Sequence, residues 1–550
     1  MAGNNRSLLI IGGGLAGMSA GCYGRMNGYQ TKIFEMHSIP GGCCTAWERK
    51  GYIFDQCIDW FLGTKPGNDM NRIWMELGAI QGKKINYFDD EFNRVVTPDG
   101  ESVTFYPDPD RLEAHLREIS PEDGDLIKEF TDGIRLFSKN PNFPFLKPEP
   151  LWNFMDKIRI YGGLLPFIRA IIKYVNIPIE EYALRFKNPV LRQAFPFIFQ
   201  QKNYDFPLLP YFYNLAAMNI RNAGYPEGGS LGLARSIEKR YLDLGGEIEY
   251  CKRVKKVLTK QDQAVGVELE DGSKHYADII ISAIDGRTTI FDLLDGKYVD
   301  DTIRELYRAL TIKDTQKVKI YEGFFLLFLG LDLDLSREPS STTYLLKDAS
   351  GITGALQNSF VVRHYCGHEP SFAPPGQSVM AVFYYSDYDC WKKLYESDRE
   401  SYRREKESVA KTIIEHLERY YPGIKGQIKA MDISTPVTAE RYTGNYKGTV
   451  MAWVPFEDTG DYVKPLINKY RMQLPGLSNF YMCGHWLSTG ALVRAAASGR
   501  FVTQFICKND GRRFKASLEQ NEGVGRGKDL RVWRSSKING SIASPAKPGR

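Results

Sequence analysis

The apolar and polar positions near the N-terminus predict a strand, a tight turn, a helix and a second strand. Residues Leu8 to Ile11 are all apolar, which is typical of a buried parallel strand. A glycine-rich stretch without charged residues follows, and a second strand is predicted from Gln30 to Phe34. This order of elements predicts the α/β class, with a Rossmann-like domain built on a parallel central sheet.

The first turn has the spacing G-x-G-x-x-G and is predicted to bind the phosphates of a dinucleotide. Its proposed contact residues are Gly12, Gly14, Leu15, Ala16 and Gly17. Glycine permits the turn, lets the backbone approach a pyrophosphate and lets the helix pack on the strand, while the free N–H groups at the helix start attract phosphate. Glu35, followed by Met36, ends the second strand and is positioned to accept the ribose hydroxyls of an adenosine. No Arg follows Glu35 directly, so NADP is disfavoured.

Two later segments again combine a glycine-rich turn with a helix and a strand. Tyr225 to Tyr250 predicts a glycine-rich entry, an amphipathic helix ending at Gly245 and a strand. Further strands are predicted over Lys252 to Leu258, Ala264 to Leu269 and Lys274 to Ser282, and the terminal strand Asp278 to Ser282 is expected to return the chain to the central sheet. Near the C-terminus, Leu477 to Cys483 predicts a strand, and a helix is predicted to begin near Gly490.

Composition adds size, charge and compartment to this picture. The 550 residues are 43% hydrophobic and 25% charged, which indicates a globular enzyme of two or more domains. The segment from Lys508 to Arg550 holds 11 Lys and Arg against 4 Asp and Glu, so the residues before it have 61 against 62. A neutral body argues against a nucleic-acid partner. Nine cysteines without a CxxC pair favour reduced thiols and a cytoplasmic location, and no segment reads as a spanning helix.

The segment after Glu35 separates FAD from NAD. It reads PGGCCTAWERKGYIFDQCIDWFLG, with a second glycine turn at Gly41 and Gly42 and a GY-x-FD stretch from Gly51. This arrangement resembles the phytoene desaturase, carotenoid isomerase and retinol saturase group of the flavin amine oxidase-like superfamily. Many desaturases of the superfamily have Arg after the Gly-Gly pair, whereas this chain has Cys43 and Cys44. The resemblance therefore favours the saturase-like and isomerase-like relatives.

The resemblance implies FAD as the cofactor and further residues that contact it. It implies that the backbone amide of Val254 contacts the edge of the adenine base. It also implies that Gly484, Ala491 and Leu492 lie near the N1/O2 edge of the flavin. It also implies a discontinuous FAD-binding domain over 1–103, 225–296 and 469–510. An inserted α+β substrate domain is expected over 104–224 and 297–468, with a basic tail over 511–550.

The first insert contains an amphipathic stretch, Tyr161 to Ile177, with Arg169 and Lys173 four residues apart on a face separate from the apolar one. Such a helix can lie in a bilayer interface, cover a hydrophobic cavity or belong to the core. Peripheral membrane contact is therefore one open reading. Phe195 to Phe199 and Phe206 to Tyr213 add aromatic residues suited to an apolar tunnel or to plain core packing.

Candidate acids and bases come from three places. Glu440 lies beside Arg441 and Tyr442; Asp59 precedes Trp60, and both are also expected near the cofactor; His485 follows Gly484. Each has a structural role as its alternative. His364, Cys366 and His368 alternate along the chain, but they lack a recognisable fourth ligand, so turn residues are favoured and no metal site is predicted.

These patterns predict an FAD-dependent oxidoreductase that acts on a carbon–carbon bond of a long apolar substrate, isoprenoid-, carotenoid- or retinoid-like by resemblance. Desaturation, saturation and isomerisation on reduced flavin all stay open. Only one dinucleotide fingerprint is present, so an external electron donor or acceptor is expected. The alternatives are an amine-oxidase-like flavoenzyme and a flavoprotein that binds an apolar ligand without turnover.

Overall fold

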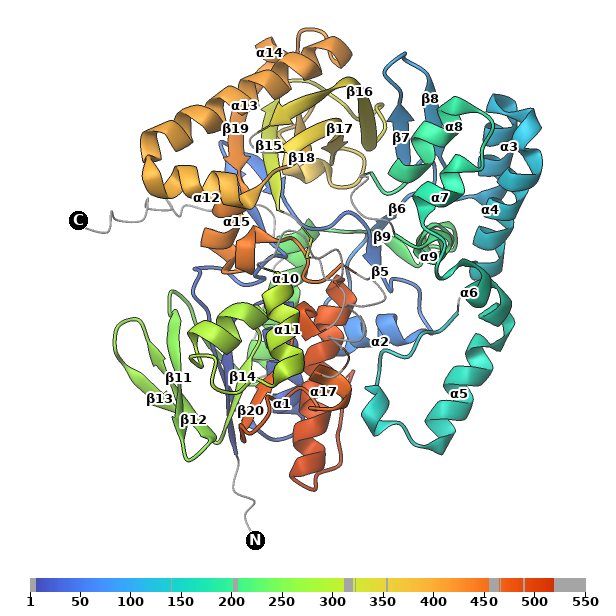
Figure 1. Cartoon of the computed structure of the whole chain (residues 1–550). Coiled ribbons are helices and arrows are strands. Elements are labelled where there is room, and N and C mark those ends of the chain that lie inside the picture. Colours follow the sequence, from blue (N-terminus) through green and yellow to red (C-terminus); the bar gives the residue numbers. More distant parts are fainter. Residues whose placement is uncertain are drawn as a thin grey trace, which may run out of the picture. The chain divides into compact units, whose positions relative to one another are not determined.

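The computed structural model describes residues 6–139, 141–200, 206–310, 320–321, 323–352, 355–454, 464, 466–487 and 490–518. Most of the predicted basic tail, from residue 519, lies outside the described residues. A five-stranded parallel sheet forms the centre of the dinucleotide-binding part (Figure 1). Its strands, in spatial order, are β10 (Glu247–Glu249), β2 (Gln30–Phe34), β1 (Ser7–Ile11), β14 (Ile279–Ser282) and β20 (Phe480–Met482). The predicted Rossmann-like α/β fold with a parallel central sheet is confirmed.

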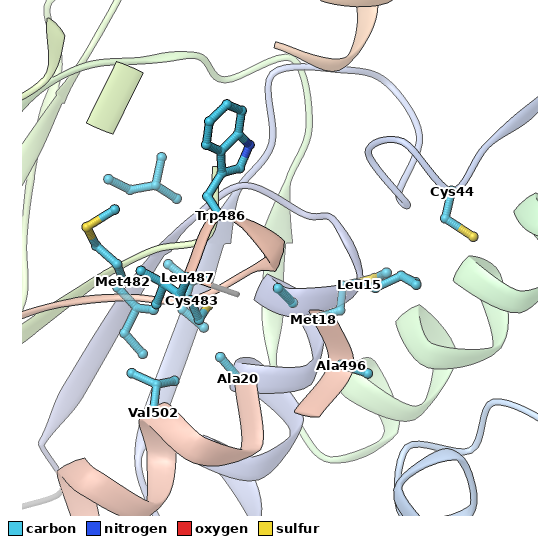
Figure 2. Close-up of a cluster of buried hydrophobic side chains, with 14 of the residues drawn as sticks. Leu15, Met18, Ala20, Cys44, Met482, Cys483, Trp486, Leu487, Ala496 and Val502 are labelled. Carbon is cyan, nitrogen blue, oxygen red and sulfur yellow. The ribbon is translucent and has the colours of Figure 1, made fainter. Parts of the chain in front are cut away.

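Three helices pack around this sheet: α1 (Leu15–Met26), α10 (Gly229–Asp243) and α17 (Leu492–Asn509). Figure 2 shows Met18, Ala20 and Val502 between α1, α17 and the sheet. Glycine sets how closely α1 and α17 approach, since a Cβ at Gly499 would meet the backbone nitrogen of Ala20 at 2.5 Å. The helix starts are thereby fixed at the carboxyl edge of the strands, where ligands of parallel sheets bind.

A three-stranded antiparallel sheet follows α10, with β11 (Val254–Lys260), β12 (Gln263–Leu269) and β13 (Lys274–Tyr276). The stretch expected as strand over Lys274 to Ser282 forms two strands in different sheets, and the second of them makes the predicted return to the central sheet. β13 pairs with β12, whereas β14 joins β1. The break falls at Asp278, whose carboxylate accepts a hydrogen bond from the backbone N–H of Ser7 at 2.8 Å and so draws the chain to the parallel sheet.

A seven-stranded sheet forms the second large layer. Its strands, in spatial order, are β19 (Ile428–Ser434), β15 (Phe324–Leu331), β18 (Ser378–Tyr385), β17 (Ala355–His364), β16 (Ser341–Ile352), β7 (Asn93–Val96) and β8 (Ser102–Phe105). Two small sheets connect the layers: β3 (Ala46–Arg49) with β4 (Tyr52–Asp55), and β5 (Phe61–Leu62) with β9 (Ala223–Pro226) and β6 (Ile85–Tyr87). One core is shared by α13 (Arg399–Tyr420) and the buried face of β15. The early strands β7 and β8 thus belong with strands far along the chain.

The first insert is helical and has its own aromatic core. Its packed helices are α3 (Pro109–Ile119), α4 (Gly124–Phe137), α7 (Ile179–Leu184), α8 (Pro189–Ala194) and α9 (Leu208–Asn219). The remaining helices of the chain include α2 (Asp69–Glu76), α11 (Asp301–Ala309), α12 (Tyr388–Ser397), α14 (Ile424–Gln427) and α15 (Pro436–Thr443). Among the described residues, no helix is both long and apolar enough to cross a bilayer.

The amphipathic stretch over Tyr161 to Ile177 is not one helix. α5 (Phe154–Leu164) ends at a short 3-10 turn over Leu165–Phe167, and α6 (Ile168–Tyr174) follows. Pro166 explains the break, because proline lacks the N–H that a continuous helix would need there. α5 has no buried residue, and it lies at the margin of the ribbon (Figure 1).

Candidate functional site

Two glycine turns meet at the carboxyl edge of the parallel sheet. Gly12 has φ of 98° and Gly41 has φ of 113°, a left-handed region that favours glycine. The backbone N–H of Gly41 donates to the carbonyl of Gly13 at 3.0 Å, and Gly14 forms a bridge with Gly41. Residues 12–17 and 41–44 therefore lie side by side, as the predicted cofactor contacts require.

The space above Gly14 tests whether a dinucleotide fits. Gly14 has φ of −71°, which any residue adopts, and a Cβ there would meet nothing closer than the carbonyl oxygen of Gly41 at 3.8 Å. Gly17 differs, because its Cβ would lie 2.0 Å from the carbonyl oxygen of Gly12. Packing inside the protein thus explains Gly17 but not Gly14. An open space at a helix start is what a pyrophosphate needs.

Glu35 and Met36 lie at the end of β2, beside this turn. One carboxylate oxygen of Glu35 accepts from the N–H of Gly13 at 2.6 Å, and the other accepts from the N–H of His37 at 2.7 Å. Burial raises the pKa of Glu35, whereas these backbone bonds lower it. A carboxylate held this way retains lone pairs for ribose hydroxyls. The sulfur of Met36 lies close to Gly444, just after α15.

Three thiols follow the second glycine turn, and all are reduced. Cys44 points toward α10 (Figure 2) and its Sγ contacts the carbonyl oxygen of Ser230 at 3.3 Å. Burial raises the pKa of Cys43 to about 12. The hydrogen bond with Cys44, together with burial, raises the pKa of Cys57 well above its ordinary value. Neutral thiols of this kind are suited to packing and poorly suited to nucleophilic attack.

The third predicted stretch also reaches the start of α1. Gly484 has φ of 111°, and a Cβ there would lie 3.9 Å from that of Ala16. Ala491 and Leu492 cap and begin α17, and both are partly exposed. Leu15 and Ala16 are buried, so only their backbone is available to a ligand. Val254 begins β11, next to the tie between the N–H of Lys252 and the carbonyl of Glu35 at 2.8 Å.

Asp59 and Trp60 lie between the glycine turns and the first insert. Asp59 forms an ion pair with Arg363 of β17, and Trp60 Nε1 donates to Asn214 Oδ1 at 2.9 Å. The Asp59 side chain is 38% exposed, yet burial raises its pKa in spite of Arg363. Asp59, Arg363, His364 and His368 border a cavity of about 10 Å³, the room that one water needs.

His485 and Glu440 have different surroundings. His485 is partly exposed, and burial lowers its pKa to about 4, so the imidazole is neutral near pH 7. Glu440 accepts from the hydroxyl of Tyr388 at 2.7 Å and from Lys392 Nζ at 3.1 Å. These two partners come from α12, and the other carboxylate oxygen accepts from the backbone N–H of Lys447 at 3.3 Å. Among the described contacts, none joins Glu440 to Asp59 or His485.

Two further groups in this region were not predicted from the sequence. Asp285 follows β14, is 2% exposed, and has one oxygen bound to the N–H of Thr288 at 2.8 Å and the other without a partner. Burial raises the pKa of Asp285 to about 6. Arg494 lies on α17. An acidic residue three positions after a parallel strand is a signal that could have identified Asp285. Arg494 has no comparable signal.

The alternating His364, Cys366 and His368 do not gather into a ligand set. His364 is the last residue of β17, and its ring nitrogens have no hydrogen-bond partner. Within the described ranges, no three His, Cys, Asp or Glu side chains are grouped so as to hold a metal ion.

The fold and the glycine turns define a dinucleotide-binding protein of the flavin oxidase fold. A family model described as an NAD(P)-binding Rossmann-like domain matches residues 10–77. Putrescine oxidase is a solved structure with this fold, at a TM-score of 0.55 and 13% identity over 92% of this chain and 99% of that one.

Two curated proteins are similar in sequence to this chain over most of its length. Prolycopene isomerase from Arabidopsis thaliana is 26% identical over 80% of this chain and 73% of its own length. The lycopene-forming phytoene desaturase of Pseudescherichia vulneris is 23% identical over 92% of this chain and 99% of its own. Over most of its length, the chain is similar to these carotenoid isomerases and desaturases.

Proposed function

We propose that this protein is an FAD-dependent oxidoreductase that acts on a carbon–carbon bond of a long apolar substrate. The observation that carries the proposal is the convergence of residues 12–17, residues 41–44 and Gly484 around the start of α1, with open space at Gly14. Relatives named for carotenoid isomerisation and desaturation support the substrate class.

The residues present fit FAD. The turn at Gly12 to Gly17 would hold the pyrophosphate, Glu35 the ribose, and the start of α17 the N1/O2 edge. When bound, FAD supplies a ring nitrogen, N5, that accepts or gives a hydride. The chain contributes orientation and a desolvated setting, because burial raises the pKa of Asp59 and lowers that of His485, which leaves His485 neutral. Asp59 forms an ion pair with Arg363, so its proposed role is to position groups beside the flavin.

We also propose the division into 1–103, 225–296 and 469–510 for FAD, and 104–224 and 297–468 for the substrate. All five strands of the parallel sheet fall in the first set, which supports the division. β7 and β8 pair within the seven-stranded sheet, which favours moving the first boundary to before Asn93.

Anaerobic spectroscopy of the purified protein tests the proposal. We expect a bound-flavin spectrum, and a redox or spectral change on adding a carotenoid or retinoid to oxidised or dithionite-reduced protein. An external electron partner is expected to restore the starting state. Bleaching by an amine would instead favour amine oxidation, and protein that stays colourless with added FAD would overturn the proposal.

The surface of α5 and α6 supports a peripheral membrane contact. The side chains that give it its apolar character are all at least 38% exposed: Phe154, Met155, Ile158, Tyr161, Leu165, Ile168, Ile172 and Val175. Lys157, Arg159, Arg169 and Lys173 are exposed on the same two helices, against one acid, Asp156. Exposed apolar side chains with surrounding cations suit a bilayer interface that contains anionic lipid.

Flotation with vesicles of phosphatidylcholine and phosphatidylserine tests this contact. We expect the wild-type protein to float, and Leu165→Glu with Ile172→Glu to stay in solution. Met431→Glu is the matched control, since Met431 is 46% exposed on β19, away from α5 and α6. Equal flotation of all three proteins would contradict the contact.

A further inference from the structure

Arg494 is an arginine that has no partner among the described residues and lies beside partly buried aromatic side chains. It is the third residue of α17, its side chain is exposed, and no described residue forms an ion pair or hydrogen bond with it. Its guanidinium carbon lies 5.8 Å from the ring centroid of Phe145, and Tyr213 and Tyr321 are its polar neighbours.

A second arginine on the same helix shows what a structural role looks like. Arg500 donates to Glu76 at 3.0 Å, and its side chain is 7% exposed. It also donates to the carbonyl oxygen of Leu146. Arg500 is thus paired with an acid and buried, whereas Arg494 on the same helix is exposed and unpaired among the described residues. The packing of α17 therefore does not explain Arg494.

Aromatic side chains from three separate segments lie around Arg494: Phe145, Tyr213 and Tyr321. Burial lowers the pKa of Arg494, which does not happen to a guanidinium surrounded by bulk water. Burial also raises the pKa of Tyr213 to about 12. Arg494 is the charge that acts on Tyr213 and on Tyr321. A desolvated cation without a counter-charge is costly, and a bound anion removes that cost.

The proposed cofactor contacts do not bring an anionic group of FAD to Arg494. Ala491 and Leu492 are the residues of α17 proposed to meet the flavin. Arg494 follows Leu492 by two positions, which turns its side chain about 200° around the helix axis. Its aromatic neighbours instead come from α9 and from the segment before α5, which belong to the proposed substrate domain.

We propose that Arg494 binds the carboxylate head of the substrate, which makes the substrate a long unsaturated lipid acid. This inference rests on the proposed function and names the substrate class of the same site. A planar guanidinium matches a carboxylate through two parallel hydrogen bonds. One cation balances one carboxylate, whereas a phosphate ester carries more negative charge, and the described neighbours of Arg494 provide no second cation.

The test compares acid and ester ligands on the flavin-loaded protein. All-trans-retinoate and methyl retinoate are titrated anaerobically, with binding read from tryptophan fluorescence and flavin absorbance. We expect retinoate to bind about tenfold to hundredfold more tightly than its ester, the range of a hydrogen bond between charged groups. Arg494→Gln is expected to remove this preference, and Arg494→Lys to retain part of it.

Arg169→Gln is the matched control, because Arg169 is exposed and forms no described ion pair. It is expected to keep the full preference for the acid. Equal binding of acid and ester by the wild-type protein would overturn the inference while leaving the proposed function intact. So would an Arg494→Gln protein that keeps the preference, or one whose only change is in flavin affinity or potential. Failure to hold flavin, or to bind either ligand, would instead overturn the proposed function.

Discussion

The contact between α1 and α17 and the surface of α5 and α6 are both rich in apolar residues, but only the first is covered. Along α1 and α17, Met18, Ala20 and Ala496 are 0% exposed, and Gly499 admits the neighbouring backbone. On α5 and α6, Ile172 is 72% exposed and Phe154 is 75% exposed. Apolar periodicity therefore predicts a buried face, and it does not say whether protein or lipid buries it.

The two regions are joined by one segment. The carbonyl oxygen of Leu146 accepts from Gln504 of α17 at 2.9 Å, and Phe145 lies over Arg494. The same segment continues through Trp152 into α5. The uncovered helices thus follow directly on the segment that contacts Arg494, which suits the transfer of a lipid from a membrane to that arginine.

The largest expected effect compares the same substitution in the covered parallel sheet and on the uncovered helix α6. Ile281→Ala removes a side chain that is 0% exposed in β14, and we expect a loss of about 2–5 kcal/mol in the free energy of unfolding. Ile172→Ala is expected to change it by less than about 0.5 kcal/mol in lipid-free buffer. Chemical unfolding measures both. A large loss for Ile172→Ala would mean that the protein itself covers α6.

The next effect is a pH dependence that only a covered region can show. The pKa of Asp285 is about 6 in the folded chain against an ordinary 3.8, so the folded state binds more protons between these values. Stability should therefore fall as pH rises from about 4 to above 6, by on the order of 3 kcal/mol. Asp285→Asn should flatten this part of the curve, measured by chemical unfolding across the range. An unchanged pH profile would contradict the assignment to Asp285.

A smaller effect concerns the cations of the uncovered surface. Lys157 and Arg169 are exposed without a described ion pair, so Lys157→Gln with Arg169→Gln should not disturb the fold. Each cation near an anionic bilayer contributes about 1 kcal/mol, so the double variant should bind vesicles containing phosphatidylserine roughly 30-fold more weakly. Binding to vesicles of phosphatidylcholine alone should not change. Equal losses on both vesicle types would point to a purely apolar contact.

What the sequence could predict follows from the range of the interactions involved. Gly12, Glu35 and Gly41 were predictable, because steric demands on a turn are local and leave a fixed spacing. The break at Pro166 was also local, yet the apolar periodicity across it concealed the break. Arg494 and the pairing of β7 with β16 were not predictable, because each depends on residues more than a hundred positions away. Glu440 was expected near the flavin and the substrate, but its carboxylate accepts a hydrogen bond from Tyr388 of α12.

The smallest predicted effect separates the two reasons for a glycine within one turn. Gly14→Ala adds a Cβ that meets nothing closer than 3.8 Å, so unfolding should be unchanged while the Kd for FAD rises about tenfold, or about 1.4 kcal/mol. Gly426→Ala is the control, since its Cβ also meets nothing and no cofactor contact is proposed there. Flavin fluorescence titration of the apoprotein gives both constants. If Gly14→Ala bound FAD as tightly as the control does, the pyrophosphate would have to lie elsewhere. The open space at Gly14 would then not be a surface that a ligand covers.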